Sequence, residues 1–203
     1  MSPKLYKTSQ KTKLTILQKA IELFNQNGTG SVTMNALADF VGMSAGNLQY
    51  HYKNKEEMIR AILEVMFARF DEIHQPRATP YTIETLRTTL RLHFNLVWEY
   101  RFFYRELAVL LRNDTLLASR FRSIQTHRIE QQEALLKKLM GMDGTHRTLN
   151  PSELRNVILI GWVLGNTWLA YSESTGQTID DNALEQAVEI MVQHYKPYLQ
   201  ELR

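Results

Sequence analysis

The 203-residue sequence contains no cysteine. Disulfide bonds and cysteine-ligated zinc sites are therefore excluded, and the composition fits a protein of the reducing cytoplasm. Long apolar runs are missing as well. The most apolar segment, residues 157–170, is too short to cross a membrane and is interrupted by Gly161, Gly165 and Asn166. The basic N-terminus lacks the apolar stretch of a signal peptide, so we expect a cytoplasmic protein that does not contact a membrane.

The sequence signatures of common enzymes are also missing. The sequence has no glycine-rich phosphate loop, no G-x-S-x-G nucleophile motif and no cysteine nucleophile. Its six histidines include no pair at metal-ligand spacing within one predicted helix. We therefore expect no catalytic residues, no metal site, no cofactor and no enzymatic activity.

The sequence contains apolar residues at helical spacing along most of its length. It shows neither strand-like alternation nor internal repeats. Hydrophobic residues make up 44% of the chain, enough for a substantial core. The pattern predicts an all-α protein. The predicted helices cover residues 13–27, 34–41, 44–51, 55–74, 82–100, 101–112, 115–140, 151–174 and 181–200.

The strongest local signal lies in residues 32–57. Thr33 is a candidate N-cap for a short helix, and Gly42 can supply the positive φ of a sharp helix end. Ser44 can cap a second helix of about two turns. Two short helices joined by a tight glycine turn are typical of the helix-turn-helix, whose second helix enters the DNA major groove.

In such a motif, exposed residues near the start of the second helix read the bases. Asn and Gln suit adenine, alanine can meet a thymine methyl group, and glycine allows close approach. Side chains at the helix ends are better placed for phosphates. The predicted DNA-binding residues are Thr33, Ser44, Ala45, Gly46, Asn47, Gln49, Tyr50, His51 and Lys55. The alternative is that Asn47 and Gln49 are ordinary solvated residues and that Tyr50 serves packing.

Residues 11–70 resemble the DNA-binding domain of the TetR (tetracycline repressor) family of bacterial regulators. The matching segments are ILQKAIELFNQNG and VTMNALADFVGMSAGNLQYHYKNKEEMI. The resemblance implies an all-helical dimer, a C-terminal ligand-binding and dimerisation domain, repression rather than activation, and a phosphate contact from Lys55. Gln49 stands where the family commonly has an aromatic residue, and Tyr52 where phenylalanine is usual. We therefore expect a distinct base preference to originate at Gln49.

Charge is unevenly distributed along the chain. Residues 1–60 carry eight Lys and Arg against four Asp and Glu, and the remainder carries sixteen against seventeen. A basic head on a nearly neutral body is expected if only the head touches a polyanion; a merely solvated basic tail is the alternative. We predict an N-terminal arm and helix-turn-helix domain at 1–55, a linking helix at 56–75 and a ligand-binding and dimerisation domain at 76–203, with a proline-rich break near residues 74–80.

Residues 157–171 form the most apolar predicted helix, and such a helix must be covered on more than one face. One face can pack on its own subunit and another on a partner. Gly161 and Gly165, four residues apart, would allow close helix approach. With the final helix, this segment predicts a four-helix homodimer interface. A core helix of a monomer is the alternative.

The body is also rich in aromatic residues, which favours a pocket for an apolar or aromatic small molecule. The alternative is that these residues are ordinary core. The predicted lining residues are His93, Phe94, Trp98, Phe102, Arg105, Trp162, Asn166 and Trp168.

These patterns together predict a homodimeric, sequence-specific transcriptional regulator, a repressor on the strength of the resemblance. It would bind a palindromic operator in double-stranded DNA and be released by a small effector. Half-sites one turn apart need recognition helices about 34 Å apart, so an effector that changes the spacing of the heads through the linking helix would release DNA. The alternatives are a DNA-binding protein or interaction scaffold without an effector, or an activator.

Overall fold

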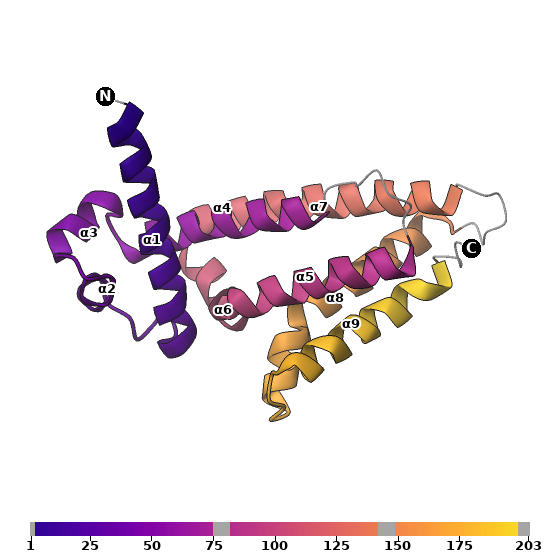
Figure 1. The fold of residues 1–203 in the computed structure, drawn as a ribbon. Coiled ribbons are helices and arrows are strands. Elements are labelled where there is room, and N and C mark those ends of the chain that lie inside the picture. The colour runs from indigo at the N-terminus through magenta and orange to yellow at the C-terminus, as the bar shows by residue number, and fades with distance from the viewer. Residues whose placement is uncertain (1–2, 75–81, 142–148, 199–203) are drawn as a thin grey trace.

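The computed structural model describes residues 3–74, 82–141 and 149–198, which form nine α-helices, one short 3-10 helix and no strand. The helices are α1 (Pro3–Asn27), α2 (Met34–Val41), α3 (Ala45–His51), α4 (Lys55–His74), α5 (Ile83–Glu99), α6 (Arg101–Asn113), α7 (Thr115–Gly141), α8 (Pro151–Ser174) and α9 (Asp181–Tyr195), followed by the 3-10 turn η1 (Lys196–Tyr198). Figure 1 shows an elongated molecule with a head of α1–α3 at one end and a body of α5–α9. The all-α prediction is confirmed.

The head is a three-helix bundle around a small apolar core. Leu37 of α2 and Leu48 of α3 are wholly buried, and they belong to the same cluster as Phe24 of α1. Tyr52, directly after α3, is also buried, and the Lys13 ammonium group lies 5.7 Å from its ring centroid. This core fixes one side of α3 and leaves the other side facing away from the molecule.

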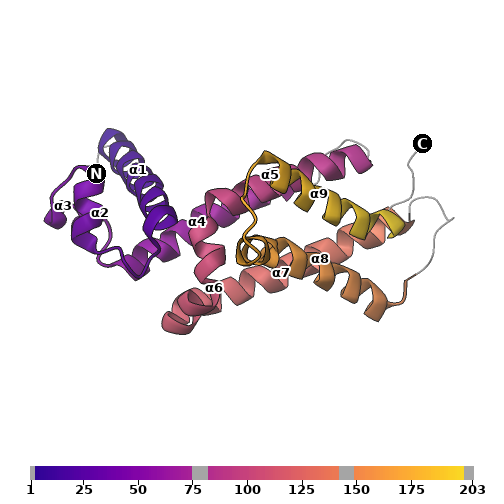
Figure 2. The same cartoon turned by 90° about the horizontal axis from the view of Figure 1, so that it is seen from below.

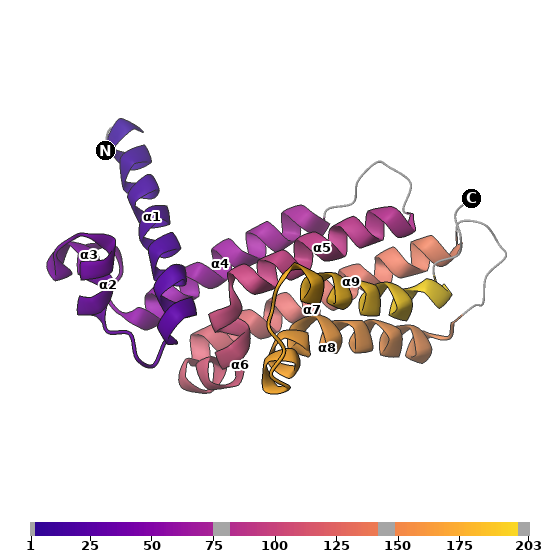
Figure 3. The same ribbon diagram turned by 60° about the horizontal axis from the view of Figure 1, so that its bottom comes forward.

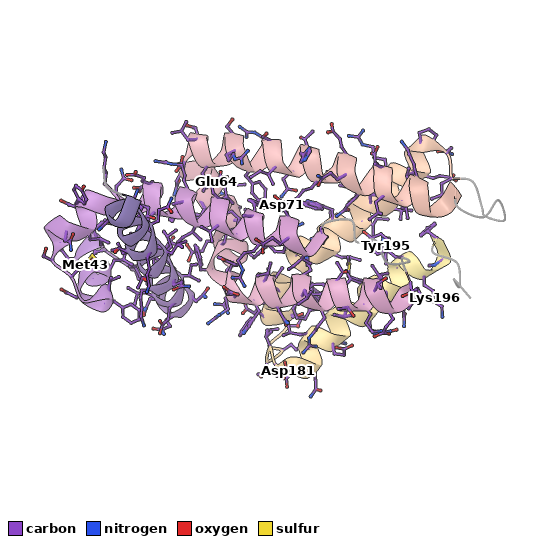
Figure 4. All side chains as sticks on the ribbon, turned by 45° about the horizontal axis from the view of Figure 1, so that its top comes forward. Met43, Glu64, Asp71, Asp181, Tyr195 and Lys196 are labelled. Atoms are coloured by element: carbon purple, nitrogen blue, oxygen red, sulfur yellow. The ribbon has the colours of Figure 1, made fainter. Side chains whose placement is uncertain are left out.

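The helix α4 runs from the head into the body and lies beside α7 (Figure 1). Two arginines of α7 bind acidic side chains along it: Arg120 Nε lies 2.6 Å from a Glu64 carboxylate oxygen, and Arg128 Nη2 lies 2.7 Å from Asp71. Figure 4 shows Glu64 and Asp71 on the side of α4 that faces α7. α4 is therefore one continuous helix from Lys55 to His74, and these two ion pairs attach it to the body.

In the body, α5 and α9 lie side by side with α8 packed against both (Figure 2). Arg87 of α5 pairs with Glu189 of α9 at 2.8 Å, and Arg91 pairs with Asp181 at 3.0 Å. A separate apolar cluster that includes Leu136 joins α7 to α8. The layers of the body are thus held by apolar packing inside and ion pairs at the rim.

Two helix ends differ from the sequence prediction by more than one residue. α1 begins at Pro3 instead of Lys13, because proline suits the first helical position and the basic tail contains good helix formers. α9 ends at Tyr195 and continues only as the 3-10 turn η1, because Pro197 has no N–H to extend an α-helix. The predicted break at residues 75–80 lies outside the described residues, as does the segment 142–148.

The two glycines of α8 make room within their own subunit. A Cβ at Gly161 would lie 2.0 Å from the Tyr195 hydroxyl oxygen, and one at Gly165 would lie 3.3 Å from His93 Nε2. Both glycines are buried. The close approach that we expected of them is therefore made by side chains of α9 and α5, and these positions are not open to a partner helix.

No helix within the described ranges is long and apolar enough to cross a membrane. In the same ranges, no group of three or more His, Cys, Asp or Glu side chains is arranged to hold a metal ion.

Candidate nucleic-acid interface and ligand pocket

Side-chain caps fix the turn between α2 and α3. The Thr33 hydroxyl oxygen accepts a hydrogen bond from the Ala36 N–H at 3.2 Å, and the Ser44 hydroxyl oxygen accepts one from the Asn47 N–H at 3.2 Å. Between them Gly42 adopts φ +82° and donates its N–H to Ala38. A residue with a Cβ would be strained there. Both predicted caps and the glycine turn are confirmed, and they set the angle between the helices.

The outer face of α3 carries the residues predicted to read bases. Leu48 points into the head core, whereas the remaining predicted residues of this helix before His51 are exposed. Tyr50 has 78% of its surface accessible. A Cβ at Gly46 would meet nothing within 4 Å. Figure 4 labels Met43 at the turn that leads into this helix. The face is polar, protruding and free to approach a groove.

His51 closes α3 and is half-buried. Its Nδ1 is buried and has no hydrogen-bond partner among the residues that the structure describes. A hydrogen on Nδ1 would be a buried donor without an acceptor, which is rarer than an unpaired acceptor, so a single ring hydrogen is better placed on Nε2. The Tyr50 ring packs edge-on against this imidazole, with centroids 5.4 Å apart. In that tautomer the ring can donate to a phosphate oxygen through Nε2.

Lys55, the predicted phosphate ligand, is tied to the loop between α1 and α2. Its ammonium group donates to the carbonyl oxygens of Thr29 at 2.5 Å and Val32 at 3.0 Å. An ammonium group has three hydrogens, so one remains for a phosphate. Thr29 is itself buried and donates both its N–H and its hydroxyl to the Glu106 carboxylate of α6. Sequence reasoning missed these contacts because the partners are distant in the chain. Lys55 and Thr29 are 26 positions apart, and Thr29 and Glu106 are 77 positions apart.

Part of the positive charge of the head is already paired. Lys19 binds Glu22 at 3.0 Å, and Arg60 binds the largely buried carboxylate of Asp114 at 2.5 Å. Lys13 and Lys53 are exposed. The charge available to DNA is therefore smaller than the formal count, which makes the position of each remaining ammonium group more important.

The body contains a hollow of about 360 Å³ between α5, α8 and α9. Phe94 and Trp168 form part of its lining, with ring centroids 5.3 Å apart in an edge-to-face arrangement. At one end the Gln177 side-chain amide donates to the Gln186 side-chain oxygen at 3.0 Å. The other lining residues are Leu164, Thr167, Tyr171, Ser172, Ala187, Ile190 and Met191.

Six of the eight predicted pocket residues do not line this hollow. The Phe102 ring packs against Phe24 at the head–body junction, with centroids 5.2 Å apart. Trp98 lies under the guanidinium groups of Arg101 and Arg105. Arg105 also binds the Glu173 carboxylate. The Asn166 amide donates to the Trp162 carbonyl oxygen at 2.7 Å. The sixth, His93, packs instead against other aromatic rings of the body core.

A cationic and aromatic cluster fills the space beside α4. The His93 ring packs against Phe70, with centroids 5.0 Å apart, and against His74 at 5.6 Å. Burial lowers the pKa of His93 to about 3, assisted by the positive charge of Arg128. Arg128 is itself only 9% exposed, and its guanidinium carbon lies 4.6 Å from the centroid of Phe67. Burial lowers the pKa of Arg128 as well.

The sequence contained a signal for this buried arginine. Phe121, Ile124 and Arg128 follow one another at spacings of three and four, which places them on one face of α7. All three are buried. A helical projection would therefore have found Arg128 on the apolar side.

The comparisons with known proteins agree with this geometry. A family model described as bacterial regulatory proteins of the tetR family matches residues 16–62, and one described as bacterial transcriptional repressor matches residues 53–203. The chain belongs to the TetR family. The second match covers the body as well as α4, so membership does not depend on the helix-turn-helix alone.

Individual relatives of this TetR-family chain match the head or the whole fold. The HTH-type transcriptional repressor KstR2 of Mycobacterium tuberculosis is 33% identical over 69 residues, or 32% of this chain and 34% of that protein. The match thus spans about a third of the length of that relative. A TetR-family transcriptional regulator from Marinobacter aquaeolei VT8 superposes with a TM-score of 0.81 and 27% identity, over 93% of this chain and 91% of that one.

A solved structure of AibR in complex with isovaleryl coenzyme A and operator DNA has the same fold as this chain. It superposes with a TM-score of 0.67 and 18% identity, over 92% of this chain and 98% of that one.

Gln49→Ala should remove base discrimination at one position of each half-site. A bidentate amide contact to adenine is worth about 1–3 kcal/mol of discrimination, and Gln49 is exposed on the outer face of α3. Competition binding measures the loss, with single-base variants of a DNA site that the protein selects from a random pool. An equal loss at every position would mean that Gln49 does not read a base.

Lys55→Ala should weaken binding to all DNA sequences by a similar factor. It should also reduce the slope of log affinity against log salt by about one per half-site, because each phosphate contact releases about one counterion. The matched control is Lys53→Ala, which removes an exposed lysine two residues earlier. An unchanged salt slope in Lys55→Ala, or the same reduction in both variants, would contradict the specific phosphate contact.

Proposed function

We propose that this TetR-family protein is a homodimeric, sequence-specific repressor that binds a palindromic operator in double-stranded DNA. A small apolar or aromatic molecule bound to the body would release it. The observation that carries the proposal is the exposed face of α3, held away from the head core by Leu48 and two side-chain caps. We further propose a cytoplasmic location, no catalytic activity, and the division into a head at 1–55, a link at 56–75 and an effector and dimerisation domain at 76–203.

An exposed apolar stripe on the body supports the dimer. Leu159, Ile160 and Val163 of α8 are each about half exposed, and Tyr171 further along the helix is 67% exposed. Ile190 of the neighbouring α9 is also exposed and lies near Tyr171, since both line the hollow between α5, α8 and α9, and Figure 3 shows α8 and α9 side by side. Contiguous apolar surface of this kind marks an interaction site. A two-fold packing of α8 and α9 would bury the stripe and pair two recognition helices.

The hollow between α5, α8 and α9 supports an effector site. Its volume of about 360 Å³ suits a small molecule. Phe94 and Trp168 offer aromatic surface, and the Gln177–Gln186 amide pair offers one polar end. That AibR has been solved with both a coenzyme A thioester and operator DNA indicates that this fold can combine the two kinds of ligand. The effector proposed for this chain is smaller and uncharged.

Selection of bound DNA from a random pool tests the DNA-binding proposal directly. Purified protein should enrich an inverted repeat with half-sites about one or more helical turns apart. An interaction scaffold would enrich nothing once the salt dependence of binding is corrected for. A reporter promoter that carries the selected site then separates repression from activation.

Tryptophan fluorescence tests the effector proposal, because Trp168 lines the hollow. A screen of small apolar and aromatic compounds should find one that quenches the fluorescence and releases the selected DNA. Trp168→Phe should lose most of that quenching, whereas Trp98→Phe, whose ring does not line the hollow, should retain it. If a broad screen finds no such compound, the effector proposal is wrong and the protein binds DNA without a small-molecule effector.

A further inference from the structure

A chain of hydrogen bonds crosses from the body into the DNA-binding head without passing along α4. The Glu106 carboxylate of α6 accepts from the Thr29 N–H at 2.9 Å and from the Thr29 hydroxyl. The Thr29 carbonyl oxygen in turn accepts from the Lys55 ammonium group at 2.5 Å. One buried residue therefore connects a carboxylate of the body with the ammonium group expected to bind a phosphate.

The local backbone is shaped for this contact. Gly28 ends α1 with φ +74°, and a Cβ at Gly28 would lie 2.8 Å from a Glu106 carboxylate oxygen. Glycine is therefore needed twice, once for the backbone conformation and once for the approach of the carboxylate. Thr29 is 6% exposed, so its two donors would lose their partner without replacement by water if Glu106 moved away.

The same helix is anchored to the part of the body that the dimer and effector would contact. Arg105, adjacent to Glu106, binds the Glu173 carboxylate near the end of α8 through Nε at 2.9 Å and 3.0 Å. Asp114, at the other end of α6, binds Arg60 of α4. A shift of α8 would therefore move α6, and Glu106 with it.

We propose that Glu106 and Thr29 are positioning residues that hold the Lys55 ammonium group in its phosphate-binding place, so that α6 controls DNA affinity through the first residue of α4 and not by a movement transmitted along that helix. The inference rests on the proposed DNA-binding function. Lys55 can reach a phosphate with its remaining hydrogen only while the carbonyl oxygens of Thr29 and Val32 stay in place. Moving Glu106 would displace the Thr29 carbonyl oxygen and, with it, the lysine.

Thr29→Val tests the relay because it removes the hydroxyl with little change in shape. It should lower the affinity for the selected DNA by roughly threefold to tenfold, the range expected for one hydrogen bond. Thr29→Ser, which keeps the hydroxyl, should restore affinity. In a chain that already carries Lys55→Ala, Thr29→Val should have no further effect, since it acts through that lysine. Glu106→Gln serves as the second variant if Thr29→Val folds poorly, with melting curves recorded for all variants.

Asn25→Ala is the matched control at the same junction. The Asn25 amide joins the head to the body by donating to the Glu99 carbonyl oxygen at 2.7 Å and accepting from the Phe102 N–H at 3.0 Å, with no contact to Lys55. Its effect should be the same with and without Lys55→Ala. Additive effects of Thr29→Val and Lys55→Ala, or unchanged affinity in Thr29→Val and Glu106→Gln, would overturn the relay. Failure of the unmodified protein to bind any DNA would instead overturn the proposed function.

Discussion

Val163→Glu should convert the protein into a monomer and reduce its affinity for a DNA with two half-sites by a hundredfold or more. Val163 lies in the middle of the exposed stripe of α8, between Ile160 and Tyr171. A two-fold interface would bring two copies of the introduced carboxylate close together in an apolar contact. An unpaired buried charge costs about 3–5 kcal/mol, which corresponds to roughly two to four powers of ten in the dimerisation constant.

Sedimentation velocity measures the oligomeric state, and titration of DNAs with one and two half-sites measures the consequence. The monomer should bind a single half-site about as well as one head of the unmodified protein does. Leu116→Glu is the matched control, because Leu116 is an exposed apolar residue at the start of α7 and belongs to neither α8 nor α9. A Val163→Glu variant that remains dimeric would remove α8 from the interface and move the dimer contact to another surface, whereas an unmodified protein that sediments as a monomer would support the monomeric alternative.

The head could be predicted almost entirely from the sequence because its determinants are local. Thr33, Gly42 and Ser44 act on backbone groups within five residues, and the structure has each of them in its predicted role. The inward position of Leu48 and the burial of Tyr52 follow from helical spacing alone. A helix-turn-helix is therefore readable without knowledge of its tertiary partners.

The partners of Lys55 could not be predicted in the same way. Its type and place favoured a phosphate contact, but its bonds to Thr29 and Val32 depend on how the loop after α1 folds back over α4. Glu106 is further removed, on a helix of the body. Nothing in the spacing of Thr29 and Glu106 distinguishes them from the other polar residues of the sequence.

The pocket prediction shows the same limit on a larger scale. Periodicity gives the apolar face of each helix but not the helix that it meets. Phe94 and Trp168 come together because α5 packs against α8, whereas Phe102, on the next helix, turns toward Phe24 of the head. Aromatic content therefore predicted that such residues would gather in the body, and only the packing of α5, α8 and α9 selects which ones.

Acidification should destabilise this protein because His93 is held neutral in the folded state. Its pKa falls from 6.5 to about 3 because burial removes water from the ring, and Arg128 and His74 add to the effect. A proton then binds the unfolded chain more tightly than the folded one, so stability is lost as the pH falls from about 6.5 towards 3. The loss should reach roughly 4 kcal/mol over the whole window, about half of it above pH 5.

Urea denaturation between pH 7.5 and pH 5 measures this slope above the range in which most carboxylates titrate. His93→Gln removes the titrating ring and should flatten the slope, leaving the smaller contribution of His74, whose pKa is also lowered by burial. His127→Gln, on the exposed side of α7, should keep the full slope. Equal slopes in the unmodified protein and His93→Gln would mean that the ring is reached by water in the folded state. A flattened slope would instead establish a neutral histidine between α4 and α8, in contact with Phe70 and Gly165, at the place where the linking helix meets the body.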